Sequence, residues 1–354
     1  MWAIGDRSIA HSRMTQRSEL LASVANTIRD YREGEIPAPT PEHVDHWIRQ
    51  FDPEVQEPIL QEIDHVLTQT YWSRDQVRNW LDHLLTRGQF VRKDPRSYWR
   101  QANFLRRQGH GTSQKDLLRL LDEVLCRKWG YSSFDCGEPG GPFVYLDDGL
   151  FSNDRVFQDL NDWIRETAPP VALVHVIVLV SHSLGEYGLS QRIAACTREH
   201  DKAIEVRVSP ESLAENRKRY RRNSDVLWPS EAPDDPHVRT FQERSITGEV
   251  FWRPLGGQTK IFSSESGRSL LERAFVIAGA RLVAKAQNPN PMMRPLGYSR
   301  FGFGFGSMTA TFRNCPNNAP LVLWWGDPAK PASHPLHWYP LLPRRIHPTE
   351  PFAG

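Results

Sequence analysis

The sequence predicts an α/β fold: a mainly parallel sheet, preceded by a helical N-terminal module and followed by an aromatic C-terminal extension that contains β-structure. Three observations point to it. Apolar residues recur at helical spacing over the first ninety residues, strand-like and helix-like patterns alternate through the middle, and the last sixty residues are rich in proline, glycine and aromatic side chains. Alternating strands and helices are typical of βαβ crossovers, which build parallel sheets. We therefore expect three domains, at residues 1–92, 93–290 and 291–354.

The composition is that of a globular protein with nearly balanced charge. The chain has 354 residues, of which 39% are hydrophobic and 24% charged, and these fractions do not fit a disordered chain. Lysine and arginine total 44 and aspartate and glutamate total 42, so the net charge is +2. This balance excludes a protein whose whole surface binds nucleic acid and leaves room only for a local basic patch.

The sequence carries no pattern of a membrane or secreted protein. Its longest apolar run, residues 171–180, contains a histidine and is ten residues long, whereas a membrane-spanning helix needs about 20. The first fourteen residues lack the apolar centre of a secretory signal. The four cysteines include no C-x-x-C pair and do not form the pattern of a disulfide scaffold. We expect a cytoplasmic protein that does not bind membranes.

The first ninety residues predict helices with recognisable starts. Thr40 and Asp52 are each followed by proline, a favoured first helical residue, and Ser73 with Gln76 forms a capping box. Apolar residues at helical spacing then extend each helix. The expected helices cover residues 20–31, 44–51, 55–67 and 77–85.

The middle of the chain predicts the parallel sheet. Residues 171–180 are rich in β-branched side chains, as expected of a strand buried on both faces. The expected strands are residues 103–108, 143–146, 171–180 and 204–208. The expected helices are residues 117–125, 154–166, 186–199 and, after the sheet, 269–285.

The C-terminal extension predicts two more strands. Residues 308–312 and 321–325 are apolar and flank the polar stretch 313–318, which contains a proline. Such a stretch between apolar runs is typical of a turn that joins two strands. The Trp324–Trp325 and Trp338–Tyr339 pairs are more typical of an aromatic core than of a platform for stacking bases.

The acid pair Asp147 and Asp148 is the strongest chemical signal. It follows the apolar strand 143–146 and precedes a short loop and a helix. In open α/β sheets ligands bind at the carboxyl ends of the strands, and a helix N-terminus favours a phosphate. Acids beside a phosphate can bind ribose hydroxyls or a divalent metal ion. The alternative is that the two acids only end the strand and cap the helix.

A second group of polar residues follows the strand 171–180. His182 lies at the same sheet edge as Asp147 and could act as a general acid or base, and Glu186 could bind a metal ion. The alternative is that both cap a helix. Ser181 and His182 are adjacent on one strand, so their side chains point to opposite faces and do not make a catalytic triad.

Residues 217–222 form a basic run, with five cations in six residues. Such a run could bind nucleic acid or a polyphosphate. The alternative is a solvated helix face whose charge is balanced by Glu211 and Glu215.

Residues 143–155 resemble the phosphoribosyl-pyrophosphate loop of type I phosphoribosyltransferases. Asp147 and Asp148 match the acid pair that contacts the ribose hydroxyls in that family, and Ser152 and Asn153 fall where the family places its phosphate-binding threonine and glycine. The sequence departs from the family at 153–155, where Asn-Asp-Arg replaces the usual Gly-Gly-Thr.

A longer part of the chain, about residues 20–345, resembles the phosphoribosyltransferase-like family of bacterial conflict systems, PRTase-CE. Four parts of the chain carry this resemblance: residues 31–37 together with the helix at 47–51, the loop 111–114, the segment 145–155, and the tail with residues 295–298, 305–307, 313–318 and 338–341. It implies a sheet of the type I phosphoribosyltransferase kind, a nucleotide-type ligand and a role in antiviral defence. Relatives of this family occur beside the reverse transcriptases of retrons.

The resemblance also implies roles for single residues. Asp147 and Asp148 would position the ribose and could hold Mg²⁺. His182 stays a further catalytic candidate because of its place at the sheet edge, and the resemblance assigns it no role. Two further sets of residues would hold the phosphates: Ser152, Asn153 and Arg155 the 5′-phosphate, and Gly111, Thr112, Ser113 and Gln114 the pyrophosphate. The second set has a plainer alternative, a glycine-bearing turn with a helix cap.

The leading hypothesis is therefore a phosphoribosyltransferase-like enzyme that acts on phosphoribosyl pyrophosphate or a nucleotide with Mg²⁺, as an effector of a defence system. One alternative is an inactive nucleotide sensor on the same fold. The other is a nucleic-acid-binding regulator. A partner protein of the defence system or a nucleic acid is a further expected partner.

Overall fold

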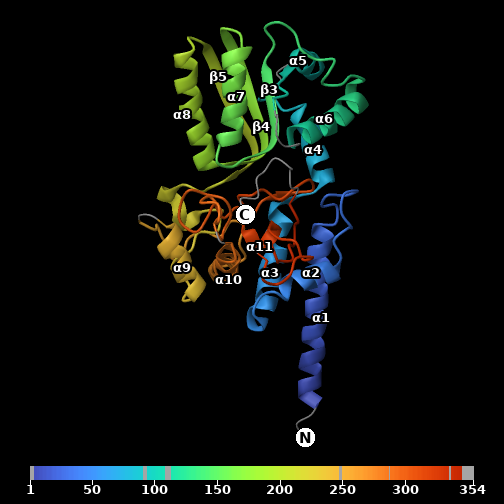
Figure 1. Ribbon diagram of the computed structural model, residues 1–354. Helices are drawn as coiled ribbons and strands as arrows, with labels where there is room; N and C mark the ends of the chain where they lie inside the picture. The colour runs from blue at the N-terminus through green and yellow to red at the C-terminus, as the bar shows by residue number, and fades with distance from the viewer. Residues whose placement is uncertain are drawn as a thin grey trace. The chain divides into compact units, whose positions relative to one another are not determined.

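The computed structural model describes residues 4–90, 94–107, 113–246, 249–286, 288–334 and 336–344, with the side chains of residues 4–13 left aside (Figure 1). The chain forms two compact units. The helical unit comprises Met1–Ser73 and Lys218–Gly354, and the sheet unit comprises Arg74–Arg217. These bounds differ from the three predicted domains, because the first and last parts of the chain belong to one unit.

The helical unit contains short parallel β-structure between distant parts of the chain. Strand β1 (Tyr71–Trp72) pairs with β6 (Ala310–Thr311). Its helices are α1 (Ile4–Thr27), α2 (Pro41–Ile48), α3 (Pro53–Thr70), α9 (Pro236–Ser245), α10 (Glu265–Ala284), α11 (Leu321–Trp324) and the 3₁₀ helix η1 (Lys218–Asn223). The start of α2 is as predicted, since the Thr40 side chain accepts a hydrogen bond from the backbone N–H of His43.

One hydrophobic core joins the N-terminal helices to the C-terminal extension. The fully buried Trp47 of α2 packs edge-to-face on Phe275 of α10, and its indole N–H donates to the carbonyl of Val322 at 2.8 Å. Trp324 and Trp338 are buried as well, which confirms the prediction of an aromatic core.

The predicted pair of strands at 308–312 and 321–325 is wrong. Residues 321–324 form the helix α11, and β6 is only two residues long and pairs with β1. A short apolar run fits a buried helix as well as a buried strand, so its periodicity does not decide between them. Here the turn after Pro320 is fixed by the indole N–H of Trp324, which donates to the carbonyl of Ala319.

The sheet unit holds the predicted parallel sheet. Its strands β2 (Asn103–Phe104), β3 (Phe143–Leu150), β4 (Val171–His182) and β5 (Ala203–Ala214) are all parallel, in the order β2-β3-β4-β5. Its helices are α4 (Arg74–Leu84), α5 (Pro95–Gln101), α6 (Ser113–Trp129), α7 (Asp154–Glu166) and α8 (Ser183–Glu199). The mixed α/β class and the parallel sheet are therefore confirmed.

Helices α7 and α8 pack on one face of this sheet (Figure 1). Their apolar residues Leu160, Trp163 and Leu189 share a core with Tyr145 of β3 and Val176 of β4. The three longer strands extend beyond the predicted ends, and β3 continues through Asp147 and Asp148 to Leu150.

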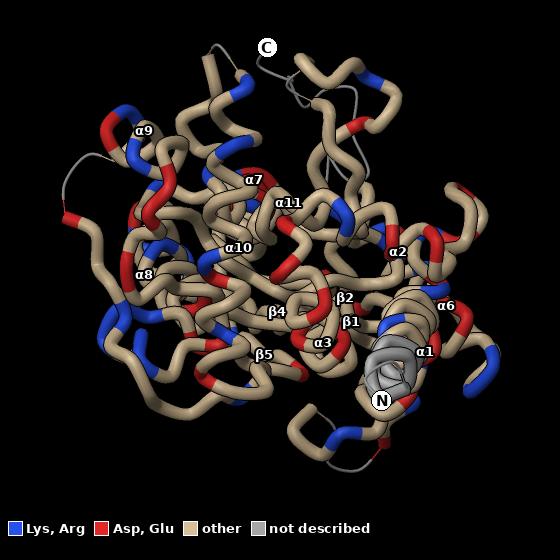
Figure 2. Tube along the Cα trace, turned by 90° about the horizontal axis from the view of Figure 1, so that it is seen from below, with Lys and Arg blue, Asp and Glu red and all other residues tan. Residues whose placement is uncertain are grey.

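Positive and negative residues are both spread over the trace of the chain (Figure 2). Among the described residues, no helix is long and apolar enough to cross a membrane. All four cysteines are free thiols.

Candidate functional site

The carboxyl ends of the parallel strands form one edge of the sheet, which we call the carboxyl edge. Leu150 of β3 lies opposite Ser181 of β4, directly before His182. Asp147 lies three positions earlier on β3, roughly 10 Å from that level at about 3.3 Å per residue. The edge therefore brings the end of β3 next to His182, while Asp147 lies further inside the sheet.

The two predicted acids do not act as one pair. Because β3 continues through them, Asp147 and Asp148 point to opposite faces of the sheet. Asp147 is buried, and its Oδ1 accepts a hydrogen bond from the backbone N–H of Asp148 at 2.9 Å. Asp148 is half-buried and is the acid with access to solvent. The prediction that both acids follow the end of the strand is wrong.

Asp159 of α7 is a third acid at this site, and the sequence reasoning missed it. The Tyr145 hydroxyl lies 2.7 Å from Oδ2 of Asp159 and 3.4 Å from Oδ2 of Asp147, so it links the two carboxyls. Burial raises the pKa of Asp159 above its usual range, and the Tyr145 hydrogen bond opposes that rise. A signal was available, because Asp159 is an acid between Val156 and Trp163 on the apolar face of its helix.

The loop after β3 leads into an α7 N-terminus that the side chain of its N-cap residue does not cap. Asn153 is the N-cap residue and has a left-handed backbone with φ of 65°, but its side chain makes no cap hydrogen bond. Its Oδ1 accepts from Arg192 Nη1 at 2.6 Å, and the same guanidinium lies 2.7 Å from Asp154. Asn153 therefore contacts Arg192 of α8 and does not cap the first turn of α7.

Helix α8 packs directly on this loop, which requires glycine at two positions. A Cβ atom at Gly185 would lie 2.1 Å from the carbonyl oxygen of Phe151, and one at Gly188 would lie 2.4 Å from Nδ2 of Asn153. The sequence gives no sign of the contact between α8 and this loop, because the contact depends on how the helix packs in three dimensions. The loop is consequently held by α8 and Arg192 together.

His182 is fully buried beside this loop. Its ring lies 5.0 Å from the ring of Phe151, measured between centroids. Burial lowers the pKa of His182 to about 4, although a hydrogen bond to the Leu150 backbone opposes the shift. The imidazole is thus neutral near pH 7, and a role in the chemistry stays a prediction. Glu186 accepts a hydrogen bond from Ser181 at 3.3 Å.

The remaining predicted phosphate ligands differ in accessibility. Ser152 and Arg155 are exposed beside the α7 N-terminus. Gln114 is buried, and its Oε1 accepts from the backbone N–H of Arg107 at 2.9 Å, so it ties the end of β2 to α6. Ser113 is the first residue of α6. Gly111 and Thr112 lie outside the described residues.

The predicted metal site depends on the carboxylate oxygens of Asp147 and Asp148 as ligands. Within the described part of the chain, no three His, Cys, Asp or Glu side chains converge as metal ligands. Since Asp147 and Asp148 point to opposite faces, they do not offer two carboxylates to one ion. The arrangement does not fit a magnesium ion held by this pair.

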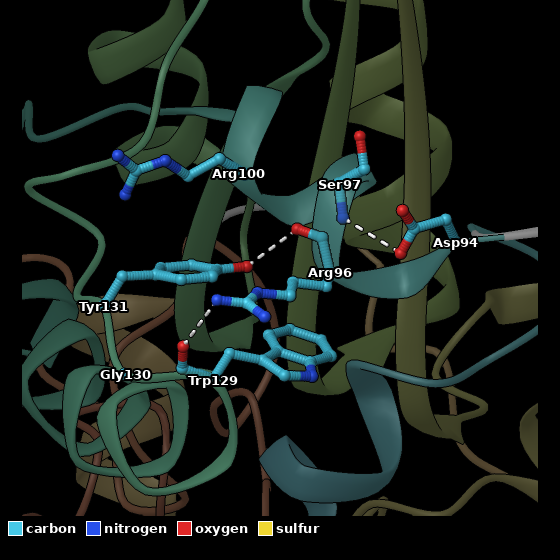
Figure 3. A pocket seen from close by; sticks show the side chains of 7 residues that line it. All are labelled: Asp94, Arg96, Ser97, Arg100, Trp129, Gly130 and Tyr131. Carbon is cyan, nitrogen blue, oxygen red and sulfur yellow. Dashed lines mark hydrogen bonds between the residues drawn. The ribbon is translucent and has the colours of Figure 1, made fainter.

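A separate pocket of about 520 Å³ lies at the opposite, amino edge of the sheet (Figure 3). The pocket is lined by residues of α5, which ends just before β2, and by residues at the end of α6, which precedes β3. It therefore lies near the amino ends of these strands. The Arg100 guanidinium lies over the Tyr131 ring, and Arg96 donates to the carbonyl of Trp129. None of the residues predicted for ligand binding lines this pocket. Its lining residues are Asp94, Arg96, Ser97, Arg100, Trp129, Gly130 and Tyr131.

Comparison with known proteins gives one positive result. The family model described as PRTase-CE matches residues 44–344, which include the strands, the acid pair, the loop at 151–153 and the C-terminal extension. No curated protein and no solved structure matched the chain. Because the match covers most of the chain, this protein belongs to the PRTase-CE family.

Proposed function

We propose that the sheet unit binds a ligand with a ribose 5-phosphate group, phosphoribosyl pyrophosphate or a nucleotide, and acts as a phosphoribosyltransferase-like enzyme. The observation that carries this proposal is the α7 N-terminus, whose N-cap residue Asn153 makes no side-chain cap hydrogen bond and which follows a parallel strand carrying Asp148. The N–H groups of a helix's first turn and the helix dipole favour a phosphate at such a place. Membership of the PRTase-CE family supports the same ligand class.

In the proposed complex the 5′-phosphate lies against the loop at 151–153 and the first turn of α7. Ser152 and Arg155 are exposed there and supply a hydroxyl donor and a positive charge. Asp154 would repel the phosphate, but Arg192 compensates its charge at 2.7 Å. Arg192 is therefore a positioning residue, because it neutralises Asp154 and orients Asn153.

Asp148 would face the ribose. Asp147 would act indirectly, because its carboxylate accepts a hydrogen bond from the backbone N–H of Asp148 and so holds Asp148 in place. The reaction would be a displacement at the anomeric carbon. The bond from this carbon to the pyrophosphate oxygen breaks, pyrophosphate leaves with the bonding electrons, and the acceptor's nucleophile forms the new bond. Positive charge develops on the ribose ring, so a nearby carboxylate stabilises the transition state.

Magnesium would enter as part of the substrate. Mg²⁺ is usually bound through one or two carboxylates together with substrate phosphates and water. With only Asp148 accessible, the ion would arrive on the diphosphate of the ligand, and no step above depends on it. The family resemblance further supports a role as an effector of an antiviral system in bacteria.

A nucleotide sensor without turnover is the second candidate. The burial of Asp147 and of the neutral His182 favours it, since neither group contacts solvent. A sensor binds its ligand and releases no pyrophosphate. The enzyme releases pyrophosphate in the presence of an acceptor.

Calorimetric titration of phosphoribosyl pyrophosphate with Mg²⁺ into the full chain tests the binding proposal. Asp148→Asn is expected to weaken binding at least tenfold, about 1.4 kcal/mol. The matched control Asp162→Asn removes an exposed acid of α7 and should bind like the wild type. Equal affinity of both variants, or no binding to the folded wild type, would contradict the proposal.

A further inference from the structure

The basic residues Lys218, Arg219, Arg221 and Arg222 of η1 form one surface, called the basic surface below, that the proposed function does not use. The predicted balancing acids do not reach it: Glu211 pairs with Arg87, and Glu215 pairs with Arg217. Within the described part of the chain, none of the four cations forms an ion pair with a carboxylate. The predicted balance by Glu215 therefore holds for Arg217, the first cation of the run 217–222, and no ion pair among the described residues extends it to these four cations.

Two of these arginines are anchored on backbone carbonyls. Arg221 donates from Nε to Trp252 at 2.8 Å and from Nη1 to Lys218 at 3.0 Å. Arg222 donates from Nε and Nη2 to Leu255, both at 3.2 Å. A guanidinium has five N–H donors, so each keeps further donors and its full charge. Carbonyl anchors fix the direction of a cation without neutralising it.

Lys218 and Arg219 are exposed and contact aromatic rings. The Lys218 ammonium lies 3.0 Å from the centre of the Phe251 ring, and the Arg219 guanidinium lies 5.7 Å from that of Tyr220. Tyr220 itself is 41% exposed. The surface thus combines four cations with an exposed aromatic ring.

Such a cluster is unfavourable without an anionic partner. Two like charges roughly 4 Å apart repel by about 1 kcal/mol even in water. Elsewhere in the chain acidic and basic residues are nearly equal in number, and both are spread over the trace (Figure 2). A polyanion that contacts several cations at once would remove the repulsion.

We propose that the basic surface binds the phosphodiester backbone of single-stranded nucleic acid, DNA or RNA. Arginine, three of the four cations, presents a planar fork that matches phosphate oxygens. The exposed Tyr220 can stack on an unpaired base, which a lipid headgroup does not provide. Backbone contacts of this kind bind with little sequence preference and weaken steeply with salt.

The test is fluorescence anisotropy of labelled oligonucleotides of about 20 nucleotides, longer than the roughly 4–16 that one binding fold covers. The full chain is titrated at several salt concentrations with single-stranded DNA, single-stranded RNA and duplex. Lys218→Glu/Arg219→Glu is the chosen variant, because neither side chain donates to a backbone carbonyl. The control Arg119→Glu/Arg127→Glu changes the net charge equally at two exposed residues of α6.

We expect the variant to bind a single strand at least tenfold more weakly than the wild type. The slope of log K against log salt should become shallower by at least about 1.4, because each of the two lost phosphate contacts accounts for about 0.7. The control should bind like the wild type, and the variant should keep its affinity for phosphoribosyl pyrophosphate. Unchanged affinity, an equal loss in the control, or equal affinity for duplex would overturn the proposal. So would binding to phosphatidylserine–phosphatidylcholine vesicles without binding to oligonucleotides.

Discussion

The two units of this protein bury charged groups in different ways. In the helical unit, Glu272 lies between Arg253 and Arg268, with three N–H groups of Arg253 and Arg268 within 2.8–2.9 Å of its oxygens. All three side chains are almost completely buried. In the sheet unit, Asp159 has the hydroxyl of Tyr145 as its partner and forms no ion pair among the described residues.

This difference distinguishes the structural network around Glu272 from the carboxyl edge, where a change of pH can change the protonation of Asp159 and His182. Opposite charges compensate each other around Glu272, so that region needs no change of protonation to remain folded. Burial raises the pKa of Glu272, and the two arginines oppose that rise. At the carboxyl edge, burial likewise shifts the pKa of Asp159 upward and that of His182 downward, and Asp159 forms no ion pair among the described residues. We therefore expect pH sensitivity to be concentrated at the edge where the ligand is proposed to bind.

The largest effect is expected in the helical unit. Glu272→Gln removes the negative charge between two buried arginines, so the free energy of unfolding should fall by about 3–5 kcal/mol. Urea denaturation of wild type and variant measures this change in the free energy of unfolding. Glu243→Gln, at an exposed position of α9, is the control and should change stability by less than about 0.5 kcal/mol. A small loss for Glu272→Gln would mean that the network does not support the fold.

The second prediction concerns His182. A folded-state pKa of about 4, against about 6.5 when unfolded, means that the unfolded chain binds the extra proton between these values. The stability due to the neutral imidazole is complete above pH 6.5 and is lost as the pH falls towards 4, by about 3 kcal/mol. His182→Gln should abolish this loss, so the difference in the free energy of urea unfolding between wild type and variant should change as the pH falls from 6.5 towards 4. Parallel curves for both proteins would contradict it.

Asp159 should show the opposite pH dependence and a smaller effect. Its folded-state pKa is raised, so the folded protein keeps a proton that the unfolded chain has released above about pH 3.9. Its contribution is complete below that pH and is lost as the pH rises through the folded pKa. Asp159→Asn should flatten this part of the stability curve. A steeper curve for the variant would show that Asp159 is ionised and favourable in the fold.

The smallest effect on stability is expected for Arg192. Its ion pair with Asp154 is partly exposed, so Arg192→Ala should lower the free energy of unfolding by less than about 1 kcal/mol. Affinity for phosphoribosyl pyrophosphate should nevertheless fall several-fold, because Asp154 is no longer compensated. Arg198→Ala, on the same helix, is the control for both measurements. Unchanged affinity would place the phosphate elsewhere.

The sequence predicted the four strands of the sheet unit and the helices α4, α6, α7 and α8 in order, because apolar periodicity and helix starts are local properties, but it missed the short helix α5. It could not predict that the first and last parts of the chain share a unit, since the Tyr71–Ala310 pairing joins distant residues. It also placed the acids after the strand, whereas β3 continues because its ladder with β4 extends to Leu150 and Ser181.

The candidate site was predicted only in part for a related reason. Residue types and motif order pointed to Asp147, Asp148 and the loop after them. The contacts of Tyr145 with Asp159, and the approach of α8 at Gly185, depend on how helices pack on the sheet. Side-chain direction along β3 decided which acid reaches solvent.

Hydrogen exchange measured by mass spectrometry, with and without phosphoribosyl pyrophosphate and Mg²⁺, tests the central claim most directly. The account predicts slower exchange in peptides that cover residues 150–156, where the first-turn amides of α7 would bind the phosphate, and no change at η1. Protection confined to the pocket between α5 and the end of α6, or no protection of the 150–156 segment at saturating ligand, would contradict it.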